Sequence, residues 1–146
     1  MKKSDPPIIV EQTFKATKEQ LWSALTELDQ LHKWFFADIP VFQPKEGFKT
    51  SFAVSNEGRT FTHLWTLTEV IPNQKITYNW KYEEWPGDSF VTFEILEKNG
   101  QNIVRLSTKV IEDFPQDIPE FKRESGIGGW NYFIKESLVK HMREQF

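Results

Sequence analysis

The sequence contains no cysteine, which excludes disulfides, thiol catalysis and thiolate metal sites together. Histidine is also scarce. Only His32, His63 and His141 are present, and no two of them have the spacing of zinc ligands. Nucleophile elbows, phosphate loops and dinucleotide fingerprints are missing as well. We therefore expect no metal ion and no cofactor.

An excess of basic residues is absent too. The chain has 18 Lys and Arg against 21 Asp and Glu, a net charge of −3, which is unlike the basic footprint of a nucleic-acid-binding protein. No apolar stretch approaches the roughly 20 residues of a membrane helix, and none of signal-peptide length follows Lys2 and Lys3. We expect no nucleic-acid partner, no membrane span and a cytoplasmic protein. The length of 146 residues predicts a single domain over 1–146.

Aromatic residues, in contrast, are abundant. They make up 15% of the chain, with 6 Trp and 13 Phe. Large rings bury much apolar area and leave few ways to pack without gaps. Two interpretations stay open at this point: a bulky core, or a cavity lined by aromatic rings.

The first part of the chain predicts one strand and two short helices. Residues Ile8 to Phe14 are rich in β-branched side chains, as is typical of a strand. Thr17-Lys18-Glu19-Gln20 fits a capping box, and apolar residues follow at helical spacing. Asp29 is expected to cap a second short helix, which Pro40 ends.

The middle of the chain predicts further strands. Apolar and polar residues alternate in each, so each strand has one apolar face, as in an antiparallel sheet with one side covered. The turn signals between them are Asn56-Glu57-Gly58, Pro72-Asn73-Gln74, Pro86-Gly87-Asp88 and Lys98-Asn99-Gly100.

The C-terminal part predicts the helix that covers this sheet. An apolar stripe at helical spacing consists of Trp130, Phe133, Ile134, Leu138 and Met142. Because glycines at 126, 128 and 129 weaken a helix, this helix either begins near Glu120 and bends, or begins only at Trp130. The resulting order, βααβββββα, predicts an α+β fold with helices on one face of the sheet.

Several short segments, in this order, resemble a known family. Leu21–Thr26 is similar to its first-helix signature, Leu31–Phe35 to a Leu-x-x-Trp-Trp motif, Glu69–Trp80 to a strand–Pro–strand hairpin, and Gly129-Trp130 to the start of its closing helix. The chain thus resembles the START-like helix-grip (SRPBCC) superfamily, in particular the group of activator of heat-shock-protein-90 ATPase homologues. The resemblance implies a helix-grip fold: a curved antiparallel β-sheet around a long C-terminal α-helix.

The resemblance carries less information on function, because this superfamily holds lipid binders, cyclases, hydrolases and chaperone regulators. We expect a non-catalytic binding module for a small hydrophobic or aromatic ligand between sheet and helix. The alternatives are a chaperone-associated or stress-related protein-interaction domain, and a cyclase or hydrolase using His63. Thr108 stands near where many members have a histidine, so any role of that histidine is in doubt here.

The candidate site is the set of side chains expected to face the covered side of the sheet. His63 shares strand parity with apolar neighbours, so it either orients a ligand and moves a proton or is a hydrogen-bonded core or rim histidine. The loop Asp113–Asp117 either lies at the cavity mouth or only connects the last strand to the C-terminal helix. The expected ligand-binding residues are Trp34, Phe52, His63, Trp65, Tyr78, Trp80, Phe93, Leu106, Trp130, Phe133 and Ile134.

Overall fold

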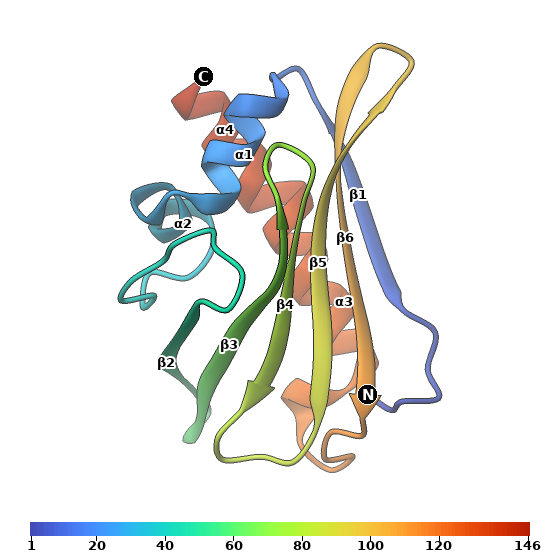
Figure 1. The fold of residues 1–146 in the computed structure, drawn as a ribbon. Coiled ribbons are helices and arrows are strands. Elements are labelled where there is room, and N and C mark those ends of the chain that lie inside the picture. The colour runs from blue at the N-terminus through green and yellow to red at the C-terminus, as the bar shows by residue number, and fades with distance from the viewer.

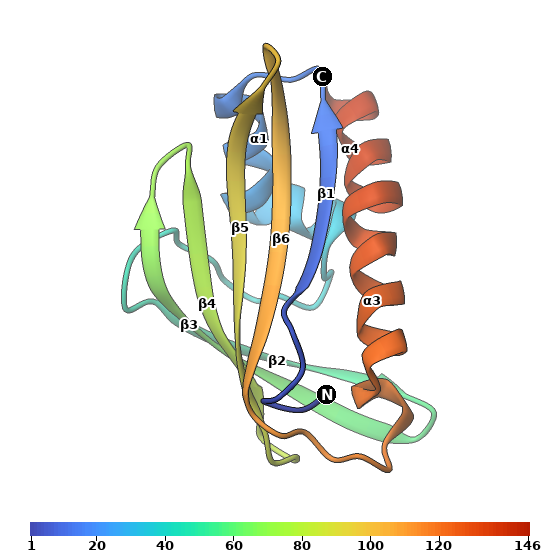
Figure 2. The same ribbon diagram turned by 90° about the vertical axis from the view of Figure 1, so that its right-hand side faces the viewer.

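A computed structural model describes all residues, 1–146. Six antiparallel strands form one sheet in the order β1-β6-β5-β4-β3-β2. The sheet curves around a long C-terminal helix, and two short helices lie beside that helix at one end (Figures 1 and 2). The expected α+β helix-grip fold is thereby confirmed. The strands are β1 (Ile8–Phe14), β2 (Lys49–Asn56), β3 (Arg59–Ile71), β4 (Lys75–Tyr82), β5 (Asp88–Lys98) and β6 (Gln101–Glu112).

The helices after the first strand are α1 (Lys18–Thr26) and α2 (Leu28–Trp34). The predicted capping box is present at α1: Gln20 N donates to Thr17 Oγ1 at 3.0 Å, and Thr17 N donates to Gln20 Oε1 at 3.0 Å.

The predicted limits of α2 are wrong. Its N-cap is Glu27, without a side-chain cap, instead of Asp29, and the helix ends at Trp34, well before Pro40. The reason is that a single extended residue, Glu27, separates the two helices (φ −87°, ψ 128°). The second helix therefore starts as soon as the chain has turned.

The predicted turns are confirmed where the backbone needs a left-handed conformation. Asn99 and Gly100 have φ of 54° and 77° between the paired residues Lys98 and Gln101, which is a two-residue hairpin loop. Glu57 and Gly58 do the same between β2 and β3, with φ of 51° and 77°.

The C-terminal helix follows a short 3-10 turn (Pro119–Phe121). It consists of α3 (Arg123–Asn131), a π-helical segment (Tyr132–Ser137) and α4 (Leu138–Gln145). It thus begins near Glu120 and not at Trp130, and the glycines lie inside α3. The irregularity comes after them, in the π-helical segment. Gly126 lets the helix approach β1 closely, because a Cβ there would be 3.3 Å from Ile8 Cδ1.

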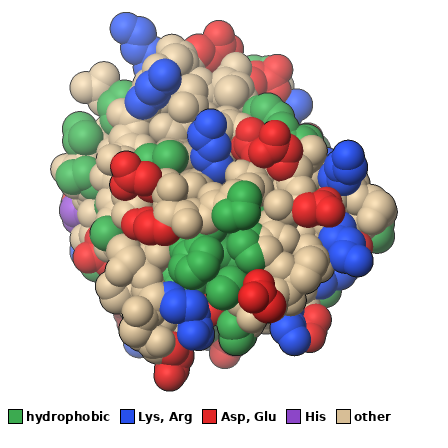
Figure 3. All heavy atoms as spheres, turned by 90° about the horizontal axis from the view of Figure 1, so that it is seen from below, with side chains coloured by type: hydrophobic (Ala, Val, Ile, Leu, Met, Phe, Trp, Pro, Cys, Tyr) green, Lys and Arg blue, Asp and Glu red, His purple; other side chains and the backbone are tan.

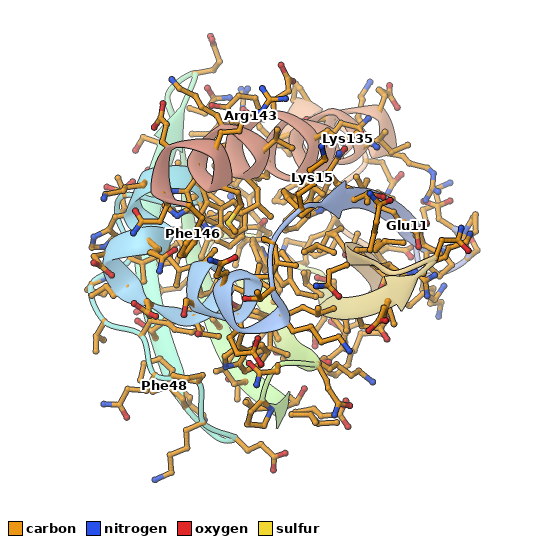
Figure 4. All side chains as sticks on the ribbon, turned by 90° about the horizontal axis from the view of Figure 1, so that it is seen from above. Glu11, Lys15, Phe48, Lys135, Arg143 and Phe146 are labelled. Atoms are coloured by element: carbon orange, nitrogen blue, oxygen red, sulfur yellow. The ribbon has the colours of Figure 1, made fainter.

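Side chains of the helix also cover the free edge of β1. Lys135 Nζ donates to the carbonyl oxygen of Glu11 at 2.7 Å, and Arg123 Nη1 donates to that of Pro6 at 2.7 Å. Figure 4 shows Lys135 on the helix and Glu11 on the neighbouring strand. Edge carbonyl groups that would otherwise be open to another strand are thereby partnered.

The core is densest at the end that carries α1 and α2, which we call the packed end. Trp34 is central to it: its side chain is 2% exposed and its Nε1 donates to Ala24 O at 2.7 Å. Its ring meets those of Phe93 and Phe133 edge to face, at centroid distances of 6.3 and 6.4 Å. Ile134 and Leu138 complete the packing from the C-terminal helix and are fully buried.

Candidate functional site

A cavity of about 160 Å³ lies at the opposite end of the interior, between the sheet and α3. We call this the cavity end. Ten of its 16 lining residues are hydrophobic. The sheet contributes side chains of β3 to β6 that share one strand parity, and the helix contributes Gly126, Gly129, Trp130 and Phe133. This arrangement of apolar walls with a few polar groups is typical of a small-molecule site.

One glycine of α3, Gly129, leaves open space at this end. A Cβ at Gly129 would meet no heavy atom within 4 Å, so the helix surface beside the cavity lacks a side chain that would fill it. At the packed end, Ile134 and Leu138 project from the same helix into the core. Between the sheet and the helix, side chains such as Ile134 and Leu138 fill the packed end, whereas no side chain projects at Gly129.

The cavity reaches the surface beside the loop that precedes α3. Phe114 and Phe121 border it there, and so does Glu120, whose side chain is 20% exposed. Phe114 is buried, so the loop Asp113–Asp117 forms part of the cavity wall and is not a plain connection. On the face seen from below, hydrophobic side chains gather in the middle, with charged groups around them (Figure 3).

The candidate residues from the sequence separate into two groups. His63, Trp80, Trp130 and Phe133 line the cavity. The others lie in the closed core and do not border it: Trp34, Phe52, Trp65, Tyr78, Phe93, Leu106 and Ile134.

Sequence reasoning missed several lining residues. Tyr82 lies on the same strand parity as Trp80, and Val91 and Thr108 on that of Phe93 and Leu106, so extending the parity along each strand would have found them. The phenylalanines Phe36, Phe114 and Phe121 come from loops and a 3-10 turn. No periodic signal marks those positions.

His63 is a buried polar group on the cavity wall, with 5% of its surface exposed. Its Nδ1 lies 3.0 Å from the carbonyl oxygen of Phe61. A carbonyl only accepts, so Nδ1 carries the hydrogen and Nε2 has a free lone pair. The ring stacks on Phe52 at 4.7 Å. Burial lowers the pKa of His63 to about 4, against the raising effect of the Phe61 hydrogen bond.

Tyr82 stands opposite His63 in the β3–β4 register, and the two ring centroids are 4.8 Å apart. Its hydroxyl oxygen accepts a hydrogen bond of 2.9 Å from Trp80 Nε1. Burial raises the pKa of Tyr82 to about 12, despite the opposing effect of the Trp80 hydrogen bond. The hydroxyl is therefore neutral at physiological pH and keeps its own hydrogen to donate.

The carboxylate that borders the cavity is already paired. Glu120 accepts from Arg59 Nε at 2.8 Å and Nη2 at 2.9 Å, and from Asn56 Nδ2 at 2.6 Å. These bonds, that of Arg59 above all, lower the pKa of Glu120 to about 2. No three His, Cys, Asp or Glu side chains are grouped so that they could hold a metal ion, and no helix is long and apolar enough to cross a membrane.

The fold and its cavity define a domain of the START-like helix-grip superfamily. Within it, the chain belongs to the family of Activator of Hsp90 ATPase homolog 1-like proteins, whose sequence profile matches residues 15–143. The resemblance inferred from the short motifs is thus confirmed. No curated protein matches the chain.

Solved structures of bacterial proteins share the fold. Protein MLL2253 from Mesorhizobium loti is 21% identical, with a TM-score of 0.73 over 97% of this chain and 99% of that one. A protein from Rhodobacter sphaeroides is 23% identical, with a TM-score of 0.73 over 96% and 93%. The Aha1 dimer from Colwellia psychrerythraea is 20% identical, with a TM-score of 0.67 over 90% and 92%.

Proposed function

We propose that this protein binds a small, uncharged apolar or aromatic molecule in the cavity between the sheet and α3. The observation that carries the proposal is the cavity itself, which has about 160 Å³ and mostly hydrophobic walls. A dry protein cavity of about 150 Å³ lined by apolar side chains binds benzene. The size therefore favours a ligand with a single ring, and the family and fold are consistent with a ligand-binding module.

The charge of the wall favours a neutral ligand. Its carboxylate, Glu120, is paired with Arg59, and no lysine or arginine borders the cavity. The terminal ammonium of Met1, which also lines the cavity, already donates to the carbonyl oxygen of Phe121 at 2.6 Å. An anion would have to leave water without gaining an unpaired cation, which is costly. Benzoate should therefore bind much more weakly than an uncharged ring of the same size.

A matched pair of helix variants tests the proposal. Gly129 and Gly128 both have open space around a would-be Cβ, but only Gly129 borders the cavity. In Gly129→Leu the new side chain should occlude the cavity and weaken binding at least about tenfold, a loss of about 1.4 kcal/mol. Gly128→Leu should bind as the unaltered protein does.

The measurement uses phenol and toluene as probes. Trp80 and Trp130 line the cavity, so their fluorescence reports an occupant, and calorimetry checks the affinity. We expect saturable binding of at least one probe with a Kd of about 1 mM or tighter. Binding of neither probe, or equal binding to both glycine variants, would contradict the proposal.

An enzyme that uses His63 is less well supported by the geometry. A general base works best with a pKa near the operating pH, whereas burial lowers that of His63 to about 4. Tyr78, another inward-facing side chain that could carry a proton, is 1% exposed, lies outside the cavity wall, and has its pKa raised by burial. His63 therefore has a pKa that is poorly matched to proton transfer at neutral pH, and Tyr78 does not border the cavity.

A chaperone-associated role is the second candidate, and the family description is the observation that favours it. Its test is direct: the ATPase rate of a purified Hsp90 chaperone is measured with and without this protein. A rate increase that saturates with added protein would support this role. An unchanged rate, with no complex in a pull-down, would exclude this role and leave ligand binding as the remaining proposal.

A further inference from the structure

Two polar groups face the cavity without satisfying all of their hydrogen-bonding capacity in the protein. His63 Nε2 forms no hydrogen bond, because the one bond of this ring is made by Nδ1 to Phe61. The Tyr82 hydroxyl accepts from Trp80 but donates to no protein atom. Nε2 therefore has an unused acceptor, and the hydroxyl has an unused donor. A ligand that supplies both partners would satisfy both groups.

The two groups have opposite roles. Nε2 of a neutral imidazole is an acceptor only, and the hydroxyl hydrogen of Tyr82 is a donor. Only two side-chain atoms are both inaccessible and without a hydrogen-bond partner, Thr50 Oγ1 and Trp65 Nε1. His63 Nε2 is not one of them, so its neighbours do not close it off from the cavity. Nε2 lies on the side of the ring opposite Nδ1, which contacts the Phe61 carbonyl.

Their positions bring both groups to one place. His63 and Tyr82 are direct partners in the β3–β4 register, point to the same side of the sheet, and have ring centroids 4.8 Å apart. Stacking on Phe52 holds the imidazole plane, and the Trp80 bond holds the tyrosine oxygen. Both orientations are therefore set before any ligand arrives, which lowers the entropy cost of binding.

From this arrangement we infer that the cavity selects a phenol: a single neutral aromatic ring whose hydroxyl donates to His63 Nε2 and accepts from the Tyr82 hydroxyl. One hydroxyl group has both a donor hydrogen and acceptor lone pairs, so it satisfies both side chains at once. The ring lies against apolar side chains of the cavity wall, such as Trp130, Val110 and Phe121. The inference rests on the proposed function, since it names the class of ligand for the same cavity.

Phenol and toluene form a matched pair of probes, because a hydroxyl replaces a methyl group of similar size. In a purely apolar cavity, toluene binds better, since the phenol hydroxyl loses its water partners without replacement. Here we expect phenol to bind about tenfold more tightly than toluene, as one or two well-formed hydrogen bonds provide. Calorimetric titration of the purified full chain with each probe gives this ratio.

Three variants locate the effect. His63→Phe and Tyr82→Phe should each lower the phenol-to-toluene affinity ratio about three- to tenfold while toluene still binds. Thr108→Val is the control: it removes another hydroxyl of the cavity wall that the inference does not use, so its ratio should stay unchanged. A fall of the ratio in Thr108→Val alone would overturn the assignment of the pair.

A spectroscopic measurement on the unaltered protein covers the case in which a variant fails to fold. Two-bond ¹H–¹⁵N spectra should show His63 as the Nδ1–H tautomer, with an Nε2 resonance that shifts on adding phenol but not toluene. If both probes bind equally and Nε2 does not shift, the phenol inference is wrong while the binding function stands. If neither probe binds, the binding function itself fails.

Discussion

The two ends of the interior use the same kinds of residue to opposite effect. At the packed end, Trp34 lies among rings and aliphatic side chains and is 2% exposed. At the cavity end, Trp80 and Trp130 border a space of about 160 Å³. The sheet presents aromatic side chains to both ends. The helix supplies Ile134 and Leu138 at one end, and Gly129 beside Trp130 and Phe133 at the other.

The comparison separates stability from binding. Removing a ring that is enclosed on all sides leaves a cavity and loses dispersion contacts, so the free energy of unfolding falls. Rings that border an existing gap are open on one side and remain available to a ligand. We therefore expect substitutions at the packed end to act on folding, and substitutions at the cavity end to act on binding.

The largest expected effect is that of Trp34→Ala. It removes a fully enclosed ring and its hydrogen bond to Ala24 O, so the free energy of unfolding should fall by about 3–5 kcal/mol. Trp130→Ala, next to the cavity, should cost about 1–2 kcal/mol. Urea unfolding of both variants checks this, and equal losses would contradict the difference between the two ends.

The next effect is a dependence of stability on pH that comes from the cavity end. The folded-state pKa of His63, about 4, lies below its ordinary value of 6.5. Between these values the unfolded chain binds more protons, so the free energy of unfolding is unaffected above pH 6.5 and falls as the pH drops toward 4. The loss by pH 4.5 should be about 2–3 kcal/mol.

Urea unfolding at pH 7 and pH 4.5 measures this loss, with His63→Phe as the comparison. The variant should lose that part of the pH dependence. Burial also lowers the pKa of His141, at the packed end, and its contribution has the same sign and remains in both proteins. An unchanged pH dependence in His63→Phe would mean that His63 is not buried as a neutral ring.

A smaller effect distinguishes the glycines of α3. Gly128→Ala meets no atom within 4 Å and should raise the free energy of unfolding by about 1 kcal/mol, the helix propensity difference. Gly126→Ala should gain less or lose, because its Cβ would lie 3.3 Å from Ile8 Cδ1 and 3.1 Å from Met1 Sδ. Thermal unfolding ranks the two, and an equal gain would show that the helix is free to move away from β1.

The smallest effect is expected where the cavity meets the surface. The Arg59–Glu120 pair is partly exposed, with side chains 29% and 20% accessible. Removing it in Arg59→Met should lower the free energy of unfolding only slightly, because exposed ion pairs contribute little, and added salt should reduce the difference further. A larger loss would mean that this pair holds the loop before α3 more firmly than an exposed ion pair does.

Much of this fold could be predicted from strand parity and turn residues. Alternation placed Trp65, Trp80 and Phe93 on the covered face, and all three are buried. The capping box at Thr17 and the Asn99-Gly100 hairpin are local motifs, and each formed as expected. Asp29 was wrong as a helix cap because the N-cap of α2 is Glu27, two residues earlier. This junction depends on how α1 and α2 pack against each other.

The cavity was harder to predict, for a physical reason. Parity tells which side chains point inward, but not whether a side chain from the helix meets them. Trp34 and Trp80 both point inward, yet only Trp80 borders a space. The glycines were interpreted as a weakness in the helix. The open space beside Gly129 becomes evident only once α3 is seen against the sheet.

The sequence by itself determined the alternating strands, the turns between them, the aromatic character of the interior and the family. These depend on residues that are close in the chain. Tertiary structure alone decided that the interior closes around Trp34 and stays open beside His63 and Tyr82. The reason is that a gap forms where two surfaces do not fit together, and the surfaces of β3–β6 and of α3 meet only in the folded chain.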